Sequence, residues 1–338
     1  MRPFKYSKTS SANSAVQMLI ANPRAKFLAG GTNILDLMKE DVERPDELVD
    51  ISRLNLTQVK IISTGANKGG ISIGGLGKNT ETANHPLIRQ NVPLLTQAIL
   101  AGASAQIRNM ATNGGNLNQR TRCQYFYETS MPCNKREPGT GCGALEGNNR
   151  MHAIFGWSEK CVAVHPSDMC VALAALDAVV KVQGANGQSR SIPFTDYHRL
   201  PEDTPQKDNN LNDSELITAI EIPKNNFASK SYYLKVRDRA SYAFALVSVA
   251  AALETEGKTI RKARIALGGV SHKPWRALEA EKFLEGKEAN EENFKQAAEL
   301  EMNKAKPLAY NGFKVELGKR AITRALMQAM NGQDKMND

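Results

Sequence analysis

Apolar residues recur along the chain with two different periods, and the alternation between them predicts a mixed α and β protein. Residues 12–21 show the spacing of a helix with one apolar face, behind a capping serine, Ser10 or Ser11. The patterns at 4–6 and 48–51 predict strands on either side of this helix. The first 60 residues are therefore predicted to form a small α/β unit.

The stretch between these strands joins a strand to a helix through paired glycines. An apolar run stops at Gly30 and Gly31, and a helical pattern begins after Thr32 and Asn33, either of which can cap the helix. Paired glycines permit a positive φ and a close approach to a ligand, and the free N–H groups suit a phosphate. The stretch matches neither the Rossmann nor the Walker pattern. It indicates either a diphosphate-binding loop or an ordinary strand–turn–helix junction.

The chain then changes to paired strands and apolar helices. Residues 59–62 and 71–73 predict a hairpin, and residues 93–105 predict a helix. A second paired-glycine stretch follows at 111–117. Each such stretch by itself is also typical of a β-turn, but two of them in one domain favour a ligand that carries phosphate.

Residues 120–160 show no regular apolar period. A structureless segment of this length inside a compact domain is uncommon, and it is usually functional or disordered. It contains three cysteines, and a fourth follows directly. A buried metal centre would supply the missing core. The spacing contains no C-x-x-C pair, so zinc, an iron–sulfur cluster and free thiols all remain open.

An apolar helix that runs into a strand is predicted at 169–182, with Cys170 as a small buried hydrophobe. The polar, turn-rich residues 200–215 predict a surface loop, and the pattern at 216–222 predicts a strand. We place a domain boundary near Asn225.

The last third begins with a strand at 232–236 and a buried run of small residues at 243–253, which fits a strand or a helix. His272 and Trp275 are expected to pack or cap rather than to catalyse. Three helical patterns close the chain, at 277–284, 291–305 and 313–330.

Composition and charge exclude several classes of protein. A length of 338 residues suits about two domains, and 41% hydrophobic with 23% charged residues is ordinary for a globular protein. No apolar run reaches about 18 residues, so no membrane span is predicted, and the N-terminus lacks the apolar core of a signal peptide. The net charge is +9, but the basic residues are dispersed and carry no nucleic-acid-binding motif. Nucleic acid is therefore not an expected partner, whereas an acidic partner subunit or simply a basic surface fits.

Four segments together resemble the FAD-binding subunit of the molybdenum hydroxylases, the xanthine dehydrogenase and aldehyde oxidoreductase group. They are AGGTN at 29–33, ATNGGN at 111–116, PSDM at 166–169 and KVRDRASYAFA at 235–245. The resemblance covers essentially the whole chain. The cysteine-bearing insert makes the chain similar to the medium subunit of the heterotrimeric periplasmic aldehyde oxidoreductases of the PaoABC type. A related insert occurs in 4-hydroxybenzoyl-CoA reductase.

The resemblance implies an α+β fold in two domains. Residues 1–224 would form the two-subdomain FAD-binding fold of the vanillyl-alcohol oxidase (PCMH-like) class. Its subdomains would be about 1–60 and 61–224, with the cysteine-bearing insert at about 120–162. Residues 225–338 would form a C-terminal α+β flavoprotein domain that covers the flavin.

The resemblance also implies which residues contact FAD. Backbone groups of a first glycine segment would line the diphosphate and ribityl chain, and a second glycine segment would make another diphosphate contact. Gly102 and Ala103 would lie near the cofactor. Asp168 would bind a ribose, and Lys235 would lie near the flavin ring and stabilise negative charge on the reduced flavin. The first segment comprises Lys26, Phe27, Leu28, Ala29, Gly30, Gly31, Thr32, Asn33 and Ile34, and the second contributes Thr112, Gly115 and Asn116.

By the same resemblance, four cysteines would bind a 4Fe-4S cluster, because four thiolates suit such a centre. The ligands would be Cys123, Cys133, Cys142 and Cys161. Arg122, Lys135 and Arg136 would offset the negative charge of the thiolates and the cluster, or else belong to a solvated loop. The cluster would be a structural staple or an electron store, and we favour the structural role.

The function implied is electron transfer, and no catalytic residue is assigned to this chain. A large partner subunit would bind the molybdenum cofactor and oxidise an aldehyde, and a small partner would carry two 2Fe-2S clusters. FAD here would pass the electrons to an external acceptor. A xanthine dehydrogenase or 4-hydroxybenzoyl-CoA reductase-like enzyme is the alternative within the family.

Two alternatives lie outside the family. They are a free-standing FAD oxidase, for which no histidine motif is present, and a non-enzymatic binding module. The expected location is the periplasm, reached by co-export with a signal-bearing partner, with the cytoplasm as the alternative.

Overall fold

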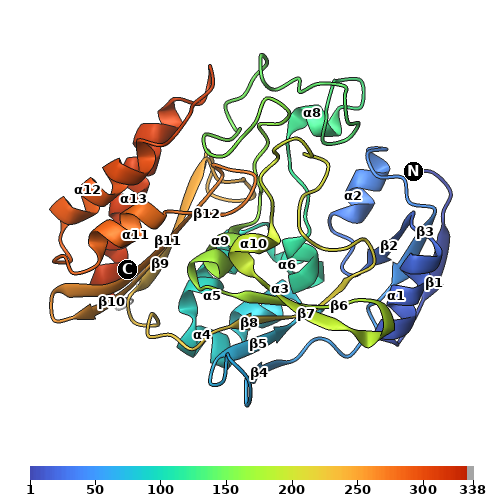
Figure 1. Ribbon diagram of the computed structural model, residues 1–338, viewed down its shortest axis with the longest axis horizontal. Helices are drawn as coiled ribbons and strands as arrows, with labels where there is room; N and C mark the ends of the chain where they lie inside the picture. Colours follow the sequence, from blue (N-terminus) through green and yellow to red (C-terminus); the bar gives the residue numbers. More distant parts are fainter. Residues whose placement is uncertain (333–338) are drawn as a thin grey trace.

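The computed structural model describes residues 1–332, and within them three sheets follow one another along the chain (Figure 1). The first sheet uses strands from residues 5–50, the second from 59–222 and the third from 231–276. A long irregular segment, drawn in green at the top of Figure 1, runs above the sheets. The mixed α and β architecture that the sequence predicts is confirmed.

The first sheet is parallel, with the strand order β1-β3-β2. Its elements are β1 (Lys5–Lys8), α1 (Ala12–Ala21), β2 (Ala25–Leu28), α2 (Ile34–Lys39) and β3 (Glu47–Asp50). The hydroxyl of Ser11 caps α1 by accepting a hydrogen bond from the N–H of Ser14 (3.3 Å). Ala15 and Val16 of α1 are fully buried in the core of this unit. The predicted small α/β unit is therefore present.

The second sheet is antiparallel, with the strand order β4-β5-β8-β6-β7. Its strands are β4 (Val59–Ile61), β5 (Ile71–Gly74), β6 (Val179–Gln183), β7 (Ser189–Pro193) and β8 (Leu216–Ile222). The predicted hairpin of β4 and β5 is confirmed. Strand β8 pairs with both β5 and β6, so a strand from late in this part of the chain occupies the middle of the sheet.

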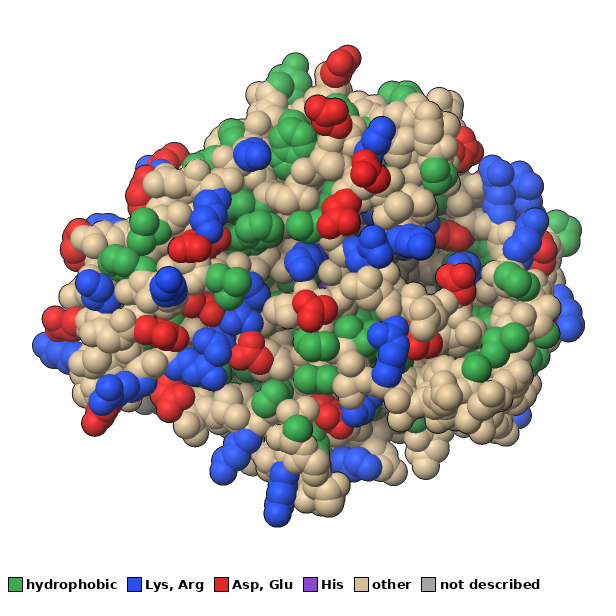
Figure 2. Space-filling view, viewed as in Figure 1, with side chains coloured by type: hydrophobic (Ala, Val, Ile, Leu, Met, Phe, Trp, Pro, Cys, Tyr) green, Lys and Arg blue, Asp and Glu red, His purple; other side chains and the backbone are tan. Residues whose placement is uncertain are grey.

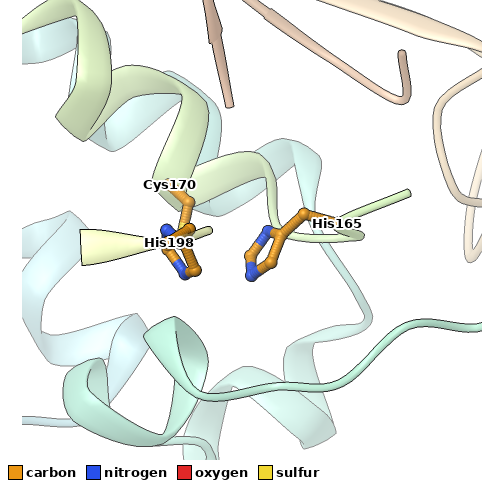
Figure 3. A group of neighbouring side chains, drawn as sticks. All are labelled: His165, Cys170 and His198. Atoms are coloured by element: carbon orange, nitrogen blue, oxygen red, sulfur yellow. The ribbon is translucent and has the colours of Figure 1, made fainter. Parts of the chain in front are cut away.

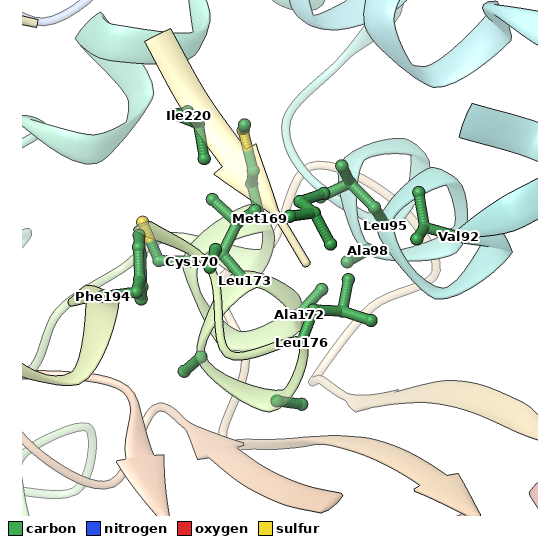
Figure 4. Close-up of a cluster of buried hydrophobic side chains, with 14 of the residues drawn as sticks. Val92, Leu95, Ala98, Met169, Cys170, Ala172, Leu173, Leu176, Phe194 and Ile220 are labelled. Atoms are coloured by element: carbon green, nitrogen blue, oxygen red, sulfur yellow. The ribbon is translucent and has the colours of Figure 1, made fainter. Parts of the chain in front are cut away.

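Short helices surround the second sheet, and two of them form its core. Helices α5 and α9 pack against each other, with Met169 and Ala172 of α9 lying beside Leu95 and Ala98 of α5 (Figure 4). Cys170 is fully buried here, as predicted. The helices are α3 (Asn79–Asn84), α4 (Pro86–Asn91), α5 (Pro93–Ala101), α6 (Ala105–Met110), α7 (Asn113–Leu117), α8 (Gln124–Tyr127), α9 (Asp168–Ala175), η1 (Ala185–Gly187) and α10 (Phe194–Tyr197).

The third sheet is antiparallel, with the strand order β12-β11-β10-β9. Its elements are β9 (Ser231–Val236), β10 (Val247–Glu256), β11 (Thr259–Gly268), β12 (Trp275–Arg276), α11 (Leu278–Leu284), α12 (Glu291–Met302) and α13 (Phe313–Asn331). Val249 and Ala251 of β10 pack toward the three helices, whereas Ala250 and Ala252 join the core around α9. The run at 243–253 is therefore mostly a strand, and its small residues allow the sheet to approach α9 closely.

The structure corrects two details of the glycine segments. The second segment is the start of a helix rather than a turn, because Thr112 caps α7 by accepting from the N–H of Gly115 (3.2 Å). Asn33 precedes α2, but its side chain does not cap that helix. Its Oδ1 instead accepts a hydrogen bond from the backbone N–H of Arg120 (3.0 Å). The oxygen that was predicted to cap α2 therefore binds a segment far away in the sequence.

The surface of the molecule carries no segregated charge on the face that Figure 2 shows. Basic side chains and acidic side chains are interspersed over it. None of the helices in residues 1–332 has the combination of length and apolar character that a membrane crossing needs.

Candidate cofactor site

Two cavities lie beside predicted cofactor residues. The larger of these, about 740 Å³, lies between the first glycine segment, α7 and the loop before β8. Every residue of the first segment except Leu28 lines it. Thr112 and Gly115 of the second segment line the same cavity, whereas Asn116 does not. The structure thus brings together the two segments that the sequence separates by some eighty residues.

Local geometry explains why this cavity is built on glycines. A Cβ on Gly30 would lie 2.1 Å from the carbonyl oxygen of Met110, and Gly31 has a φ of +74°. No residue larger than glycine fits the first position, and L-residues rarely adopt the backbone of the second. Asn33 lines the cavity with its Nδ2 buried and without a hydrogen-bond partner among the described residues. A bound ligand with acceptor oxygens, such as the diphosphate of FAD, fits that donor.

Charged residues that the sequence analysis did not select also line the larger cavity. Arg199 makes polar contacts with Asn210 Oδ1 (3.4 Å) and Thr204 Oγ1 (3.2 Å), and within residues 1–332 it pairs with no carboxylate. Its Nε is buried without a partner. An unneutralised guanidinium beside the glycine segments suits a doubly charged diphosphate.

The predicted surface loop at 200–215 is therefore a wall of the cavity, which corrects that prediction. Residues 206–213 line the cavity, and so do Leu216 and Ile217 at the start of β8. The loop is irregular, as expected, but it is folded against the glycine segments. Its polar, turn-rich composition gives no sign of this contact, because the contact is made with residues far away in the sequence.

The smaller cavity, about 260 Å³, lies where three parts of the molecule meet. The cysteine-bearing segment contributes Cys123 and His152, the start of α9 contributes Asp168, and the C-terminal domain contributes Phe244 and Gly269. A ligand in this cavity would touch the cysteine-bearing segment and the C-terminal domain at the same time.

Asp168 and Lys235, which were predicted to serve different parts of FAD, form one buried ion pair. Lys235 Nζ lies 2.8 Å from Asp168 Oδ2, with side chains 5% and 8% exposed. Tyr233 donates its hydroxyl to Asp168 Oδ1 (2.7 Å), and Lys235 also donates to the carbonyl of Ala101 (3.0 Å). The pair joins the start of α9 to strand β9 of the C-terminal domain.

Gly102 and Ala103 lie beside this pair rather than at the larger cavity. A Cβ on Gly102 would lie 3.2 Å from Asp168 Oδ2, and Ala103 has a φ of +51°. Asn116 connects the two groups of predicted FAD residues, because its Oδ1 accepts from the hydroxyl of Ser167 (2.5 Å), the residue before Asp168. The predicted contacts thus divide between two neighbouring places, and each individual role stays a prediction.

The four predicted cluster ligands converge. The backbones of Cys133 and Cys142 form a bridge of two adjacent extended segments. A hydrogen bond between the thiols of Cys142 and Cys161 lowers the pKa of Cys142 and raises that of Cys161. Burial raises the pKa of Cys123 to about 12, with smaller contributions from the charges of Cys133 and Cys142. No disulfide involves any cysteine of the chain.

Of the three basic residues predicted to offset thiolate charge, Lys135 does so, because its charge acts to lower the pKa of Cys161, whereas the guanidinium groups of Arg122 and Arg136 bind other partners. Arg136 donates to a series of carbonyl groups, including those of Tyr125, Phe126 and Met131. Arg122 binds Asp36 (2.9 Å) and the hydroxyl of Tyr127. These side chains shape the irregular segment, hereafter the cysteine loop (residues 120–162).

A buried charge cluster attaches the cysteine loop to the rest of the molecule. Lys135, with a side chain 2% exposed, lies 2.6 Å from Asp208. Arg120 pairs with Asp208 (2.8 Å) and Glu43 (2.5 Å) and donates to the carbonyl of Lys135 (3.3 Å). Although burial alone would raise it, Lys135 and Arg120 hold the pKa of Asp208 well below its usual range. The same arginine that binds Asn33 thus joins the glycine segments to the cysteine loop.

Two histidines reach the sulfur atoms. His152 Nε2 lies 3.1 Å from Cys123 Sγ, and His272 Nε2 lies 3.2 Å from Cys161 Sγ. Burial lowers the pKa of His152 to about 4 and that of His272 well below its usual value, so both imidazoles are neutral. The expectation that His272 packs or caps missed this contact, since 111 positions separate it from Cys161.

A third group of metal-ligating side chains, His165, Cys170 and His198, lies in the main core (Figure 3). Their ligand atoms are within 4.8 Å of one another. His198 Nε2 lies 2.9 Å from the carbonyl oxygen of Leu117, to which it donates. Burial lowers the pKa of His198 to about 4 and raises that of Cys170 to about 12. All three side chains are therefore neutral, and they pack as part of the core.

Comparison with known proteins agrees with this geometry. The family described as FAD binding domain in molybdopterin dehydrogenase matches residues 2–225, and the CO dehydrogenase flavoprotein C-terminal domain matches residues 232–329. The chain is 46% identical to the aldehyde oxidoreductase FAD-binding subunit PaoB of Escherichia coli (strain K12), over 97% of this chain and 99% of that protein. It is 31% identical to the glyceraldehyde dehydrogenase medium chain of Sulfolobus acidocaldarius, over 87% and 85%.

Solved structures share the fold over nearly the full length. Carbon monoxide dehydrogenase from Hydrogenophaga pseudoflava superposes with a TM-score of 0.75 at 23% identity, covering 98% of this chain and 99% of that chain. Quinoline 2-oxidoreductase from Pseudomonas putida 86 gives 0.73 at 24% identity, covering 98% of each. From the family matches and the identity over nearly the whole chain, this chain belongs to the FAD-binding medium subunits of the molybdenum hydroxylases and is an oxidoreductase subunit.

Proposed function

We propose that this chain is the FAD and 4Fe-4S electron-transfer subunit of a heterotrimeric, molybdenum-dependent aldehyde oxidoreductase. A large subunit would carry the molybdenum cofactor, a small subunit would carry 2Fe-2S clusters, and this chain would deliver electrons to an external acceptor. The 46% identity to a subunit named for aldehyde oxidoreductase favours this enzyme over a xanthine dehydrogenase or a hydroxybenzoyl-CoA reductase. Membership of the family argues against a free-standing oxidase and a non-enzymatic binding module.

The observation that carries the proposal is the smaller cavity, which Cys123 and Asp168 share. A flavin ring held near Asp168 and Lys235 would lie beside the cysteine loop. FAD, when bound, supplies a centre that accepts single electrons and releases them in pairs. The larger cavity would hold the diphosphate through the glycine segments and Arg199. The chain would thus hold the ring of FAD and the cysteine set side by side.

The arrangement of the cysteines supports a cluster in preference to zinc. A single tetrahedral zinc with bonds of about 2.3 Å holds its sulfur atoms about 3.8 Å apart. Within residues 1–332, the potential metal ligands that lie within 4.8 Å of one another in a group of three or more are His165, Cys170 and His198 in the core. No three sulfur atoms of the cysteine loop are therefore that close to one another. Four separated thiols suit a larger, multi-iron centre.

The cluster would act mainly as a structural staple. The cysteine loop contains one helix of four residues. Apart from Ile154 and Phe155, which pack in the core of the C-terminal domain, its apolar clusters are small, with three buried residues in each of two. Replacing Cys133 with Ser and measuring flavin reduction in the assembled complex tests this role. A normal rate in a folded complex excludes electron transfer through the cluster, and a large drop in rate with intact FAD excludes a purely structural one.

The location of the complex is also part of the proposal. The enzyme would be periplasmic and would be exported in folded form with a partner that carries the signal. Fractionation of intact cells tests this, because recovery of the subunit only from the cytoplasm contradicts it.

The experiment that tests the cofactor content is a visible spectrum of the purified protein with iron and sulfide assays. Flavin bands, a broad shoulder and about four irons per chain are expected for one cubane cluster. Flavin without iron would leave the family intact and overturn the cluster. A folded, colourless protein that FAD cannot reconstitute would overturn the proposed function.

A further inference from the structure

We infer that His152 and His272 donate Nε2–H···S hydrogen bonds to two of the four cluster thiolates and thereby raise the reduction potential of the cluster. This inference rests on the proposed 4Fe-4S function of the cysteine loop. It assigns to both histidines a positioning and tuning role, not a ligand role.

The first support is geometric. Each histidine places one ring nitrogen on one sulfur: His152 on Cys123 at 3.1 Å and His272 on Cys161 at 3.2 Å. Both distances are within the range of a hydrogen bond to sulfur. Both imidazoles are more than nine-tenths buried.

The second support concerns which nitrogen of each ring carries a proton. The Nδ1 atoms of both histidines are buried and have no hydrogen-bond partner within residues 1–332. Each ring nitrogen of an imidazole carries either a proton or a lone pair, and a metal-bound thiolate has no proton to donate. The ring proton must therefore lie on Nε2 for a favourable contact with sulfur, because two lone pairs would otherwise face each other.

The third support is that the rest of the fold fixes the backbone that carries both rings. The carbonyl of His152 accepts from Lys314 Nζ (2.9 Å) and Asn311 Nδ2 (3.2 Å), which belong to the C-terminal domain. His272 follows strand β11, and its neighbour Ser271 accepts from the N–H of His165 (2.9 Å). The C-terminal domain therefore positions both donors, while Cys133 and Cys142 receive no imidazole.

The consequence for the cluster follows from charge. A hydrogen bond to a thiolate withdraws electron density, and this favours the reduced state, which carries one more negative charge. Removing either donor should therefore lower the reduction potential. The unequal distribution, with two of the four thiolates receiving donors, also makes the irons inequivalent.

The test is a redox titration of the full-length protein in its complex, followed by electron paramagnetic resonance, with His272→Phe and His152→Phe. Each variant that keeps four irons is expected to shift the reduction equilibrium about tenfold toward the oxidised form, about 59 mV for a one-electron couple. His272→Gln, which retains an N–H donor, is expected to recover most of the shift. His85→Phe is the matched control, since His85 caps α4 and contacts no cysteine.

The outcomes separate this inference from the proposed function. A wild-type protein without iron overturns the cluster itself. Four irons with an unchanged potential in both Phe variants overturn the tuning role. If the variants lose iron, pulsed resonance of the reduced wild type with 15N-labelled histidine decides the question. A weak 15N coupling supports the hydrogen bonds, whereas no coupling, or the strong coupling of an iron–nitrogen bond, overturns them.

Discussion

The glycine segments and the cysteine loop, the two regions proposed to hold cofactors, are stabilised in opposite ways. The glycine segments lie at the ends of regular elements, and their shape follows from Gly30 and Gly31 and from the Thr112 cap of α7. The cysteine loop has almost no regular structure, and charged side chains hold it from outside. Arg120 and Lys135 bind carboxylates on other segments.

Local backbone geometry thus shapes the glycine segments, whereas ion pairs to distant segments hold the cysteine loop. A change in a glycine segment alters a few backbone positions, and the rest of the fold remains. A change in the charge cluster should loosen the first half of the cysteine loop, whereas Ile154 and Phe155 stay packed in the core of the C-terminal domain. Variants in the two regions should therefore separate loss of FAD from loss of the loop.

The largest effect is expected for Asp208→Asn. The substitution leaves Lys135 and part of Arg120 without a charged partner, and breaking a buried pair in this way costs about 3–5 kcal/mol. Denaturant unfolding of the variant measures the cost, and the cysteine loop should become sensitive to proteases. Asp213→Asn is the control, because Asp213 lies in the same loop but is exposed and forms no ion pair with any residue from 1 to 332. Equal stability of both variants would contradict the role of the charge cluster.

The pH dependence of this variant has a defined sign. A carboxyl group whose pKa is lower in the folded than in the unfolded protein stabilises the fold at pH values above its usual pKa of about 4. That contribution is lost as the pH falls through the lower folded pKa. The stability difference between wild type and Asp208→Asn should therefore stay constant from pH 7 to about 5 and shrink below about 4. A difference that grows on acidification would contradict the lowered pKa of Asp208.

Gly30→Ala should have the next largest effect, and it should act on FAD. The new Cβ would lie 2.1 Å from the carbonyl oxygen of Met110, so the two glycine segments must move apart. Overpacking of this kind costs about 1–3 kcal/mol, and the protein should be purified without flavin. The iron content proposed for the cysteine loop should be the same as in the wild type. Gly312→Ala is the control, since a Cβ there meets open space.

Arg199→Ala should weaken FAD binding without unfolding the protein. Loss of one charged contact to a diphosphate is expected to lower the affinity about tenfold. Fluorescence titration of the flavin-free protein measures this change. Arg89→Ala, at an exposed arginine of α4 that has no ion-pair partner in the described part of the chain, should leave the affinity unchanged. If Arg199→Ala binds FAD as tightly as wild type, the diphosphate does not contact this guanidinium.

The smallest effect is expected for Asp238→Asn. The ion pair of Asp238 with Arg150 (2.8 Å) joins the cysteine loop to the C-terminal domain, but its side chains are 55% and 44% exposed. Exposed pairs contribute little, so the unfolding midpoint should not change measurably. A large loss of stability here would mean that surface charges, as well as buried ones, hold the loop.

The same contrast explains what the sequence could predict. Periodicity located the β4–β5 hairpin, the α9–β6 unit and the three closing helices, because these depend on neighbouring residues. It left the strand at 247–256 ambiguous, since small residues suit a strand and a helix alike, and pairing with β11 decides between them. Two features depend on the tertiary fold, and no local sequence pattern predicts them. They are the cavity wall formed by residues 206–213 and the contact of His272 with Cys161.

Resemblance to a family supplied what periodicity lacked. It named the four cysteines that converge, although their spacing alone leaves zinc and free thiols open. It did not indicate that Asp168 and Lys235 form one ion pair, nor that Arg136 serves carbonyl groups instead of thiolates. Family likeness thus located the residues, whereas their contacts required coordinates.

The position of β8 sets an order of events during synthesis. This strand lies between β5 and β6, so the central sheet cannot close until residue 222 has left the ribosome. By then the four cysteines have long been exposed, and His272 and Lys314 have not yet been made. A cofactor that binds to the nascent chain would find an incomplete site, because these C-terminal residues are still missing. Insertion should therefore await release of the whole polypeptide, which gives maturation factors in the cell a defined moment to act.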